Sequence, residues 1–190
     1  MTSASGCEEH SIDAVRARCE RGDSLQFQFL FFWGHETSRP DEVGKECLSQ
    51  WYPSSFVVDG VRFPTAEHYM MYRKATLFSD EASAQQVLLA SSPKDAKALG
   101  RAVRGFDAVV WDAHCRDIVV AGNLAKFSQS ERLRTFLVAT GDRVLVEASP
   151  VDRIWGIGLS VDHVDVGNPL RWRGRNLLGF ALMDVRAQLR

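Results

Sequence analysis

The sequence has no excess of charge of either sign. Its 23 lysine and arginine residues balance 24 aspartate and glutamate residues, which gives a formal net charge of −1 at pH 7. A chain without an overall positive field is not attracted as a whole to nucleic acids or anionic membranes. The balanced charge argues against general binding of polyanions. A basic patch would have to be local.

Long hydrophobic runs are also missing. No apolar stretch approaches the ~20 residues that a membrane-spanning helix needs. The N-terminal segment "MTSASGCEEHSIDAVRARCERGD" is polar and has no apolar core of the kind found in signal peptides. We therefore expect no membrane partner and a cytoplasmic location.

The common patterns for disulfides, metals and phosphate loops are absent as well. No histidine pair has HxxxH or HExxH spacing, and no glycine-rich dinucleotide or P-loop motif follows a strand. We therefore expect no bound metal and no cofactor. The four cysteines have neither CxxC nor zinc-finger spacing, and we interpret them as free thiols in a reducing compartment: Cys7, Cys19, Cys47 and Cys115.

What is present is a few strands among many helices. Alternating phenylalanines in "LQFQFLFFWG" predict a strand, and "FVVDGVRF" predicts a hairpin with a type I′ turn. A second strand is predicted over 142–149. Periodicity and capping residues predict helices over 64–78, 79–91, 92–103, 106–129, 130–141 and 176–190.

This order of elements favours a helix-rich α+β fold rather than a repeating βαβ sheet. We expect a single domain with a small β-sheet over residues 25–190, preceded by an N-terminal extension over 1–24. The largely apolar segment 106–129 is expected to form a buried helix, and Asn176 is expected to cap the C-terminal helix.

The helix predicted over 64–78 is apolar on almost every side, yet it carries Glu67 and Lys74. Seven residues apart, these two lie on one face with Cα atoms about 10 Å apart. That separation is too long for a routine helix ion pair and suits two groups that flank a ligand. Alternatively, Glu67 only complements the helix N-terminus, and Lys74 extends to solvent.

Two further segments combine polar groups with apolar surroundings. In "GNLAKFSQ", Asn123 lies one turn before Lys126, so both could point the same way, or the helix simply emerges into solvent. In "ASPVDRIWGIG" at 148–158, Asp152, Arg153 and Trp155 follow a predicted strand together with two glycines. This stretch is either the wall of a site or an Asx-type turn with a tryptophan in the core.

A basic segment, "LRWRGRN" at 170–176, precedes the C-terminal helix. Its arginines could bind a phosphate through guanidinium forks, helped by free backbone N–H groups at the helix N-terminus. A solvated basic loop is the alternative.

Three segments together resemble the NADAR domain family, the YbiA-like N-glycosidases. They are "LSQWYPSSFVVDGVRFPTAEHYMMYRKATLFSD", "AKFSQSERLRTFLVATGDRVLVEASPVDRIWGIGL" and "WRGRNLLGFALMDVRAQL". The resemblance runs from about Phe29 to Leu189, and it departs from the family pattern where the usual Ser-Asn-Phe reads Ser49, Gln50, Trp51. It implies a compact helix-rich α+β fold and hydrolysis of an N-glycosidic bond to ribose.

The family motifs imply which residues carry the reaction. The catalytic candidates are Glu67, Asp152, Lys74 and Lys126. Further residues are candidates for substrate binding, because tryptophans can stack on a base or sugar and arginines can bind a phosphate. They are Trp51, Arg153, Trp155, Gly156, Arg171, Arg173 and Asn176.

Two mechanisms fit these residues. In the first, Glu67 and Asp152 share the work of stabilising an oxocarbenium-like state, activating water and protonating the leaving nitrogen. In the second, a desolvated lysine forms a Schiff base with ribose C1′, with Lys74 the first choice and Lys126 the second.

The resemblance implies two substrate sets. The first is the phosphoribosylamino-pyrimidine intermediates of riboflavin biosynthesis, and the second is ADP-ribose attached to guanine, including guanine in ADP-ribosylated nucleic acid. A different class, a module that binds ADP-ribose or a nucleotide without cleaving it, also remains open. The intact acids and lysines favour an enzyme.

Overall fold

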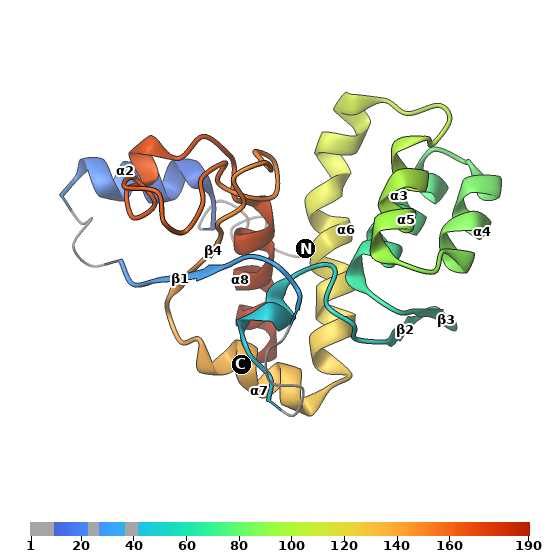
Figure 1. Cartoon of the computed structure of the whole chain (residues 1–190), viewed down its shortest axis with the longest axis horizontal. Helices are drawn as coiled ribbons and strands as arrows, with labels where there is room; N and C mark the ends of the chain where they lie inside the picture. The colour runs from blue at the N-terminus through green and yellow to red at the C-terminus, as the bar shows by residue number, and fades with distance from the viewer. Residues whose placement is uncertain (1–9, 23–26, 37–41) are drawn as a thin grey trace, which may run out of the picture. The chain divides into compact units, whose positions relative to one another are not determined.

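The computed structural model describes residues 10–22, 27–36 and 42–190. The chain divides into two compact units, which we call the terminal unit (Met1–Trp33 with Thr135–Arg190) and the middle unit (Gly34–Arg134). Each unit has its own secondary structure, shown along the chain in Figure 1. Of the predictions above, Cys7 lies outside the described residues.

The terminal unit is built on a short parallel ladder. Strands β1 and β4 pair in parallel from Phe29↔Val144 to Phe32↔Glu147, and α8 packs on β4 (Figure 1). Both strands lie within the ranges predicted from the sequence, although burial does not alternate along either: only Phe32 of β1 is buried, and Val144, Leu145 and Val146 of β4 are all buried. The elements of this unit are α2 (Ile12–Glu20), β1 (Phe29–Phe32), β4 (Val144–Glu147), η3 (Pro169–Arg171) and α8 (Leu177–Leu189).

The middle unit is a small helical assembly with a hairpin. Helix α3 packs against α4, α5 and α6, and Figure 1 shows α3, α4 and α5 side by side. The elements are η2 (Lys45–Leu48), β2 (Phe56–Val58), β3 (Val61–Phe63), α3 (Ala66–Leu77), α4 (Glu81–Leu89), α5 (Pro93–Arg101) and α6 (Ala108–Ser128). Helix α7 (Glu131–Ala139) follows α6 in the chain. The predicted helix-rich α+β class is confirmed.

The hairpin turn and the helix caps follow local sequence rules. Asp59 and Gly60 both have positive φ, 50° and 79°, as the predicted type I′ turn requires. The Thr65 hydroxyl accepts the His68 N–H at the start of α3, and Ser92 caps α5 with Pro93 at its first position.

Helix α6 differs from the expectation of a fully buried helix. Its first two turns are largely exposed, with Val109 80% and Val110 38% exposed. The buried residues recur at intervals of three and four from Cys115 to Phe127, so they form a stripe along one face of the rest of the helix. Apolar composition was therefore a misleading sign, because only the positions on one face of the helix have neighbours to pack against.

No helix of the described part of the chain is long and apolar enough to cross a membrane.

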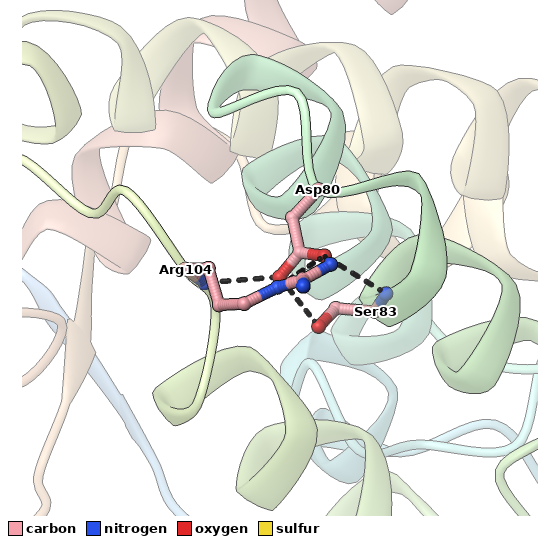
Figure 2. Close-up of polar contacts among 3 residues, drawn as sticks. All are labelled: Asp80, Ser83 and Arg104. Carbon is pink, nitrogen blue, oxygen red and sulfur yellow. Dashed lines mark hydrogen bonds and ion pairs between the residues drawn. The ribbon is translucent and has the colours of Figure 1, made fainter.

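The junction of α3, α4 and the segment after α5 is held by Asp80, drawn in Figure 2. The Asp80 carboxylate caps α4 by accepting the Ser83 N–H, and it also accepts the Ser83 hydroxyl at 2.7 Å. The Arg104 backbone N–H, Nε and Nη2 donate to the same carboxylate at 2.9, 3.2 and 2.7 Å. These hydrogen bonds hold the pKa of Asp80 well below its usual range.

We expect Asp80→Asn to lower the melting temperature by about 5 °C or more at neutral pH, because the cap and the charge-assisted bonds to Arg104 are weakened. Since the folded state depresses the pKa of Asp80, its contribution is complete above the unfolded value of 3.8 and is lost as the pH falls below it. Thermal denaturation from pH 7 to about pH 2 should therefore show a constant difference between the two proteins down to about pH 4 and a progressively smaller one below it. The same change at exposed Asp162 is the control; equal melting temperatures for both variants at pH 7 would contradict this assignment.

Candidate functional site

The middle unit contains a cluster of four buried polar side chains. They are Gln50, Glu67, Asn123 and Lys126, with exposed fractions of 6%, 2%, 0% and 0%. Polar groups at this depth are retained only when hydrogen bonds offset the loss of water. Their partners therefore show what the cluster is arranged to do.

Lys126, in the last turn of α6, holds η2 and the residue that follows it. Its Nζ donates to the carbonyl oxygens of Cys47 at 2.6 Å and Ser49 at 2.9 Å. Burial lowers the pKa of Lys126 to about 8, because desolvation penalises the ammonium form. The ring of Tyr52 lies 5.6 Å from the same nitrogen and adds a cation–π contact.

Gln50 connects this segment to both neighbouring helices. Its carbonyl oxygen accepts the backbone N–H of Glu67 at 3.0 Å, so it serves one of the orphan donors in the first turn of α3. Its side-chain Nε2 donates to Asn123 Oδ1 at 3.1 Å, and Asn123 in turn donates to the Val119 carbonyl. Lys126 and the Glu67 backbone therefore bind consecutive carbonyl groups, those of Ser49 and Gln50.

The family motif assigns no role to Gln50, and Asn123 is not among the predicted site residues. The signal for Asn123 was present, since it lies one turn before Lys126 on the same face of α6. The signal for Gln50 was its position at a conspicuous family motif, where the longer amide takes the place of asparagine. What the sequence could not show is that these two amides bind each other across 73 positions.

Lys74 is not part of this hydrogen-bonded cluster. Its Nζ donates to the Gly100 carbonyl at 2.8 Å, near the C-terminal end of α5, where a positive charge is favourable. The nitrogen lies 4.1 Å from the Phe106 ring centre and 5.5 Å from that of Trp111. Desolvation, with a smaller effect of Arg101, lowers the pKa of Lys74. The lysine is half-buried, so it is neither the solvent-extended side chain of the alternative interpretation nor fully closed off.

Trp51 and His68 are two further aromatic side chains of the middle unit, and they have different surroundings. The Trp51 ring is half-buried, lies 5.6 Å from the ring of His35 and has Lys97 Nζ 5.8 Å from its centre. His68 is 1% exposed and bonded through its ring nitrogens to Thr65 and the Ala90 carbonyl. Burial lowers the pKa of His68, which fits a structural histidine.

In the terminal unit, "ASPVDRIWGIG" contains the Asx-type turn that was one of its two interpretations. Asp152 Oδ1 accepts the N–H groups of Ile154 and Trp155 at 2.9 and 2.8 Å. A Cβ at Gly156 would lie 2.8 Å from the Glu147 carbonyl, so this glycine permits one backbone segment to approach another. Trp155 is half-buried and Arg153 is exposed.

The basic segment differs from the prediction in one respect. The backbone N–H groups of residues 171–173 and 175–178 all donate to backbone carbonyls, five of them to residues 153–157. They are therefore not free to bind a phosphate, because the preceding loop already caps the start of α8. The side chains are different: Arg153, Arg171 and Arg173 are exposed. Arg153 Cγ and Arg173 Cβ both lie close to Gly158, each 3.1 Å from a Cβ placed there.

Asn176 has a structural position. It precedes α8 with φ of 53°, and its side chain does not cap the helix, contrary to the prediction. Instead, its amide accepts the Glu147 N–H at 3.0 Å and donates to the Leu145 carbonyl at 2.9 Å. The side chain thus continues the hydrogen bonding of β4, because this edge has no further strand to pair with.

Among the described residues, no group of three or more histidine, cysteine, aspartate or glutamate side chains is placed to hold a metal ion.

The fold and the buried polar cluster define a helix-rich α+β domain, and comparison with known proteins supplies its family. The model of the NADAR domain matches residues 31–190. An N-glycosidase of Acanthamoeba polyphaga mimivirus is 40% identical over 166 residues, covering 85% of this chain and 96% of the relative. N-glycosidase YbiA of Escherichia coli K12 is 34% identical, covering 70% of this chain and 74% of the relative.

A solved structure agrees. The NMR structure of E. coli YbiA superimposes with a TM-score of 0.68 at 28% identity and covers 85% of this chain and 84% of YbiA. The chain belongs to the NADAR family, as the resemblance in its motifs implied.

We expect Asn123→Leu to lower the free energy of unfolding by about 1–3 kcal/mol, because it leaves the buried Gln50 amide without its acceptor. Gln50→Leu should have a similar cost. The double variant should be less destabilised than the sum of the two, since removing both partners leaves no unpaired amide. Urea denaturation of the four proteins measures this coupling, and strictly additive effects would show that the bond between the two amides does not stabilise the fold.

Proposed function

We propose that this chain is an N-glycosidase that hydrolyses the C1′–N bond of phosphoribosylamino-pyrimidine intermediates of riboflavin biosynthesis. Curated relatives over most of the chain are named N-glycosidases, which supports the reaction class. The substrate is our own inference. The observation that carries the proposal is a buried acid, Glu67, in a unit that also contains two lysines with lowered pKa values.

Glu67 is proposed as the acid of the reaction. A carboxyl group shielded from water at the start of an apolar helix is suited to protonating a leaving nitrogen as the C1′–N bond breaks. Its position is fixed by the bond from its backbone to Gln50, which Lys126 supports from the neighbouring carbonyl. Fixed geometry of this kind is what acid catalysis requires.

The covalent mechanism assigns different roles to the two lysines. Lys74 is half-buried, so a ligand can reach its amine, and its lowered pKa increases the neutral, nucleophilic fraction at pH 7. The Lys74 amine would form a bond to C1′ of the opened ribosylamine, and the base would leave with a proton from Glu67. Water then hydrolyses the Schiff base and releases ribose phosphate and Lys74.

Lys126 is fully covered and is proposed to position the segment around Gln50.

The candidates in the terminal unit have proposed binding roles. Asp152 uses one carboxylate oxygen in its turn, and its second oxygen is proposed to hold a ribose hydroxyl. Arg153 and Arg173, which lie close to Gly158, are proposed to bind the phosphate, with Arg171 as a further cation. Trp51, Trp155 and Gly156 remain proposals for contacts with the sugar and base, and Asn176 is proposed to act only by supporting β4.

We expect Glu67→Gln to lower kcat by about 10²-fold or more while the circular dichroism spectrum and melting curve stay close to those of the parent. The assay measures ribose phosphate released from the phosphoribosylamino-pyrimidine, in parallel with ADP-ribose released from ADP-ribosylated guanosine. Full activity of Glu67→Gln on either substrate would refute its role. Release only from the guanosine substrate would keep the bond class and replace the proposed substrate, whereas binding without release from both would identify a binding module.

We expect borohydride to trap a covalent adduct on Lys74 when the enzyme is turning over substrate. Mass spectrometry of peptides should locate the adduct there in the parent and in Lys126→Met, and should find none in Lys74→Met. A trapped adduct on Lys126 would reverse the roles of the two lysines. Absence of any adduct during measured turnover would support direct hydrolysis with Glu67 and Asp152 instead.

A further inference from the structure

The terminal unit contains a cavity that is lined by α2, the start of β4, α8 and the two residues before β1, and that has a volume of about 480 Å³. Its polar walls include Arg18, Asp142, Arg186 and Arg190. None of the residues proposed above for the reaction lines it. The cavity therefore needs an explanation of its own.

Arg186 is the most unusual side chain of this cavity, since it is charged and only 4% exposed. Its Nη1 donates to the Thr140 hydroxyl at 2.8 Å and to the Arg143 carbonyl at 2.9 Å. Its Nε and Nη2 make no hydrogen bond to the described residues. Nε and Nη2 form the side of the guanidinium that binds a carboxylate or a phosphate with two parallel bonds.

The charges around the cavity are not balanced. Asp142 pairs with Arg190 at 2.9 Å, which uses the one carboxylate among the described lining residues. Arg18 lies over the Phe27 ring at 4.5 Å and has no carboxylate within ion-pair distance in the described chain. Among the described residues, neither Arg18, which is exposed, nor Arg186 forms an ion pair, and Asp142, already paired with Arg190, is the one described carboxylate close enough to act on Arg186. Burial, with Arg190 as a smaller contribution, lowers the pKa of Arg186 to about 10, so the group remains protonated at neutral pH.

The accessible wall of the cavity is more polar than apolar, and apolar side chains form its smaller part. Val15, Val144 and Met183 contribute side chains that are at least nine-tenths buried, and Phe27 adds an aromatic ring. Small-molecule sites commonly combine such an apolar surface with a few fixed polar groups. A matching ligand therefore has one anionic group and an apolar or aromatic body.

We propose that this cavity binds a small anionic ligand through its carboxylate or phosphate group, with Arg186 as the anchor and Arg18 as the second cation. Arg18 belongs to α2, which precedes the residues matched by the NADAR model. Arg16 fixes this helix by donating to the carbonyls of Pro169 at 3.3 Å and Trp172 at 3.0 Å. The segment before the family domain thus completes a binding site.

The test is a titration of the full chain with phenyl phosphate, benzoate and the uncharged benzyl alcohol, followed by calorimetry and NMR of the arginine side chains. We expect at least one anion to bind saturably with a shift of the Arg186 Nε–H signal, and benzyl alcohol to bind at least about tenfold more weakly. Tighter binding of phenyl phosphate identifies a phosphate ligand, and tighter binding of benzoate identifies a carboxylate.

Variants on α2 separate this site from general charge attraction. Arg18→Gln should weaken anion binding about tenfold, as expected for loss of a charged partner. Arg21→Gln is the matched control, because it removes the same charge from the exposed end of the same helix. Arg186→Lys should also weaken binding, since it keeps the charge and loses the fork; if it does not fold, Arg18→Gln carries the test.

Three outcomes would overturn the proposal. The first is no saturable binding of either anion up to about 10 mM. The second is equal binding of benzyl alcohol and the anions. The third is an equal effect of Arg18→Gln and Arg21→Gln.

Discussion

The completely buried ammonium group of Lys126 is the contact on which the candidate site of the middle unit depends. A charge without solvent must find hydrogen-bond partners, and here it takes the carbonyl oxygens of Cys47 in η2 and of Ser49 just after it. The bond to Ser49 fixes the residue just before Gln50. The Gln50 carbonyl in turn accepts the backbone N–H of Glu67 in the first turn of α3. The position of the proposed catalytic acid is therefore coupled to a lysine almost sixty residues further along the chain.

The terminal unit uses a different device to fix its loops. Here the main chain itself makes the contacts, with the carbonyls of residues 153–157 receiving the N–H groups that lead into α8. A Cβ on Gly174 would collide with the Gly156 carbonyl, so the two segments can approach only because residue 174 has no side chain. Asn176 then closes the free edge of β4 with its amide. Motif residues in this unit thus support the backbone, while the arginine side chains stay exposed.

The two sets of polar groups differ in what a ligand would find. In the middle unit, the polar atoms of Gln50, Asn123 and Lys126 are largely used by the protein, which gives rigid positions to the groups around them. Lys74 is held more loosely, by one carbonyl and two aromatic rings. In the cavity among α2, β4 and α8, Arg186 uses only Nη1 for hydrogen bonds to the described residues, and Nε and Nη2 are not used in this way. Binding sites combine rigid support with donors that the protein itself does not use. Rigid support reduces the conformational entropy lost on binding, and the unused donors contact the ligand.

Local rules in the sequence determined much of the secondary structure. The Asp59-Gly60 turn, the Thr65 and Ser92 caps and the alternation in β1 each depend on residues within a few positions of one another, so they could be predicted directly. The motifs around Glu67 and Lys126 also identified the family. The side-chain partners could not be predicted, because Gln50 with Asn123, Lys74 with Gly100 and Arg186 with Thr140 are brought together from distant positions by packing. Tertiary structure alone therefore decided which face of α6 is buried, that the N–H groups before α8 are occupied, and that α2 borders a cavity where Arg18 and Arg186 form no ion pair with the described residues.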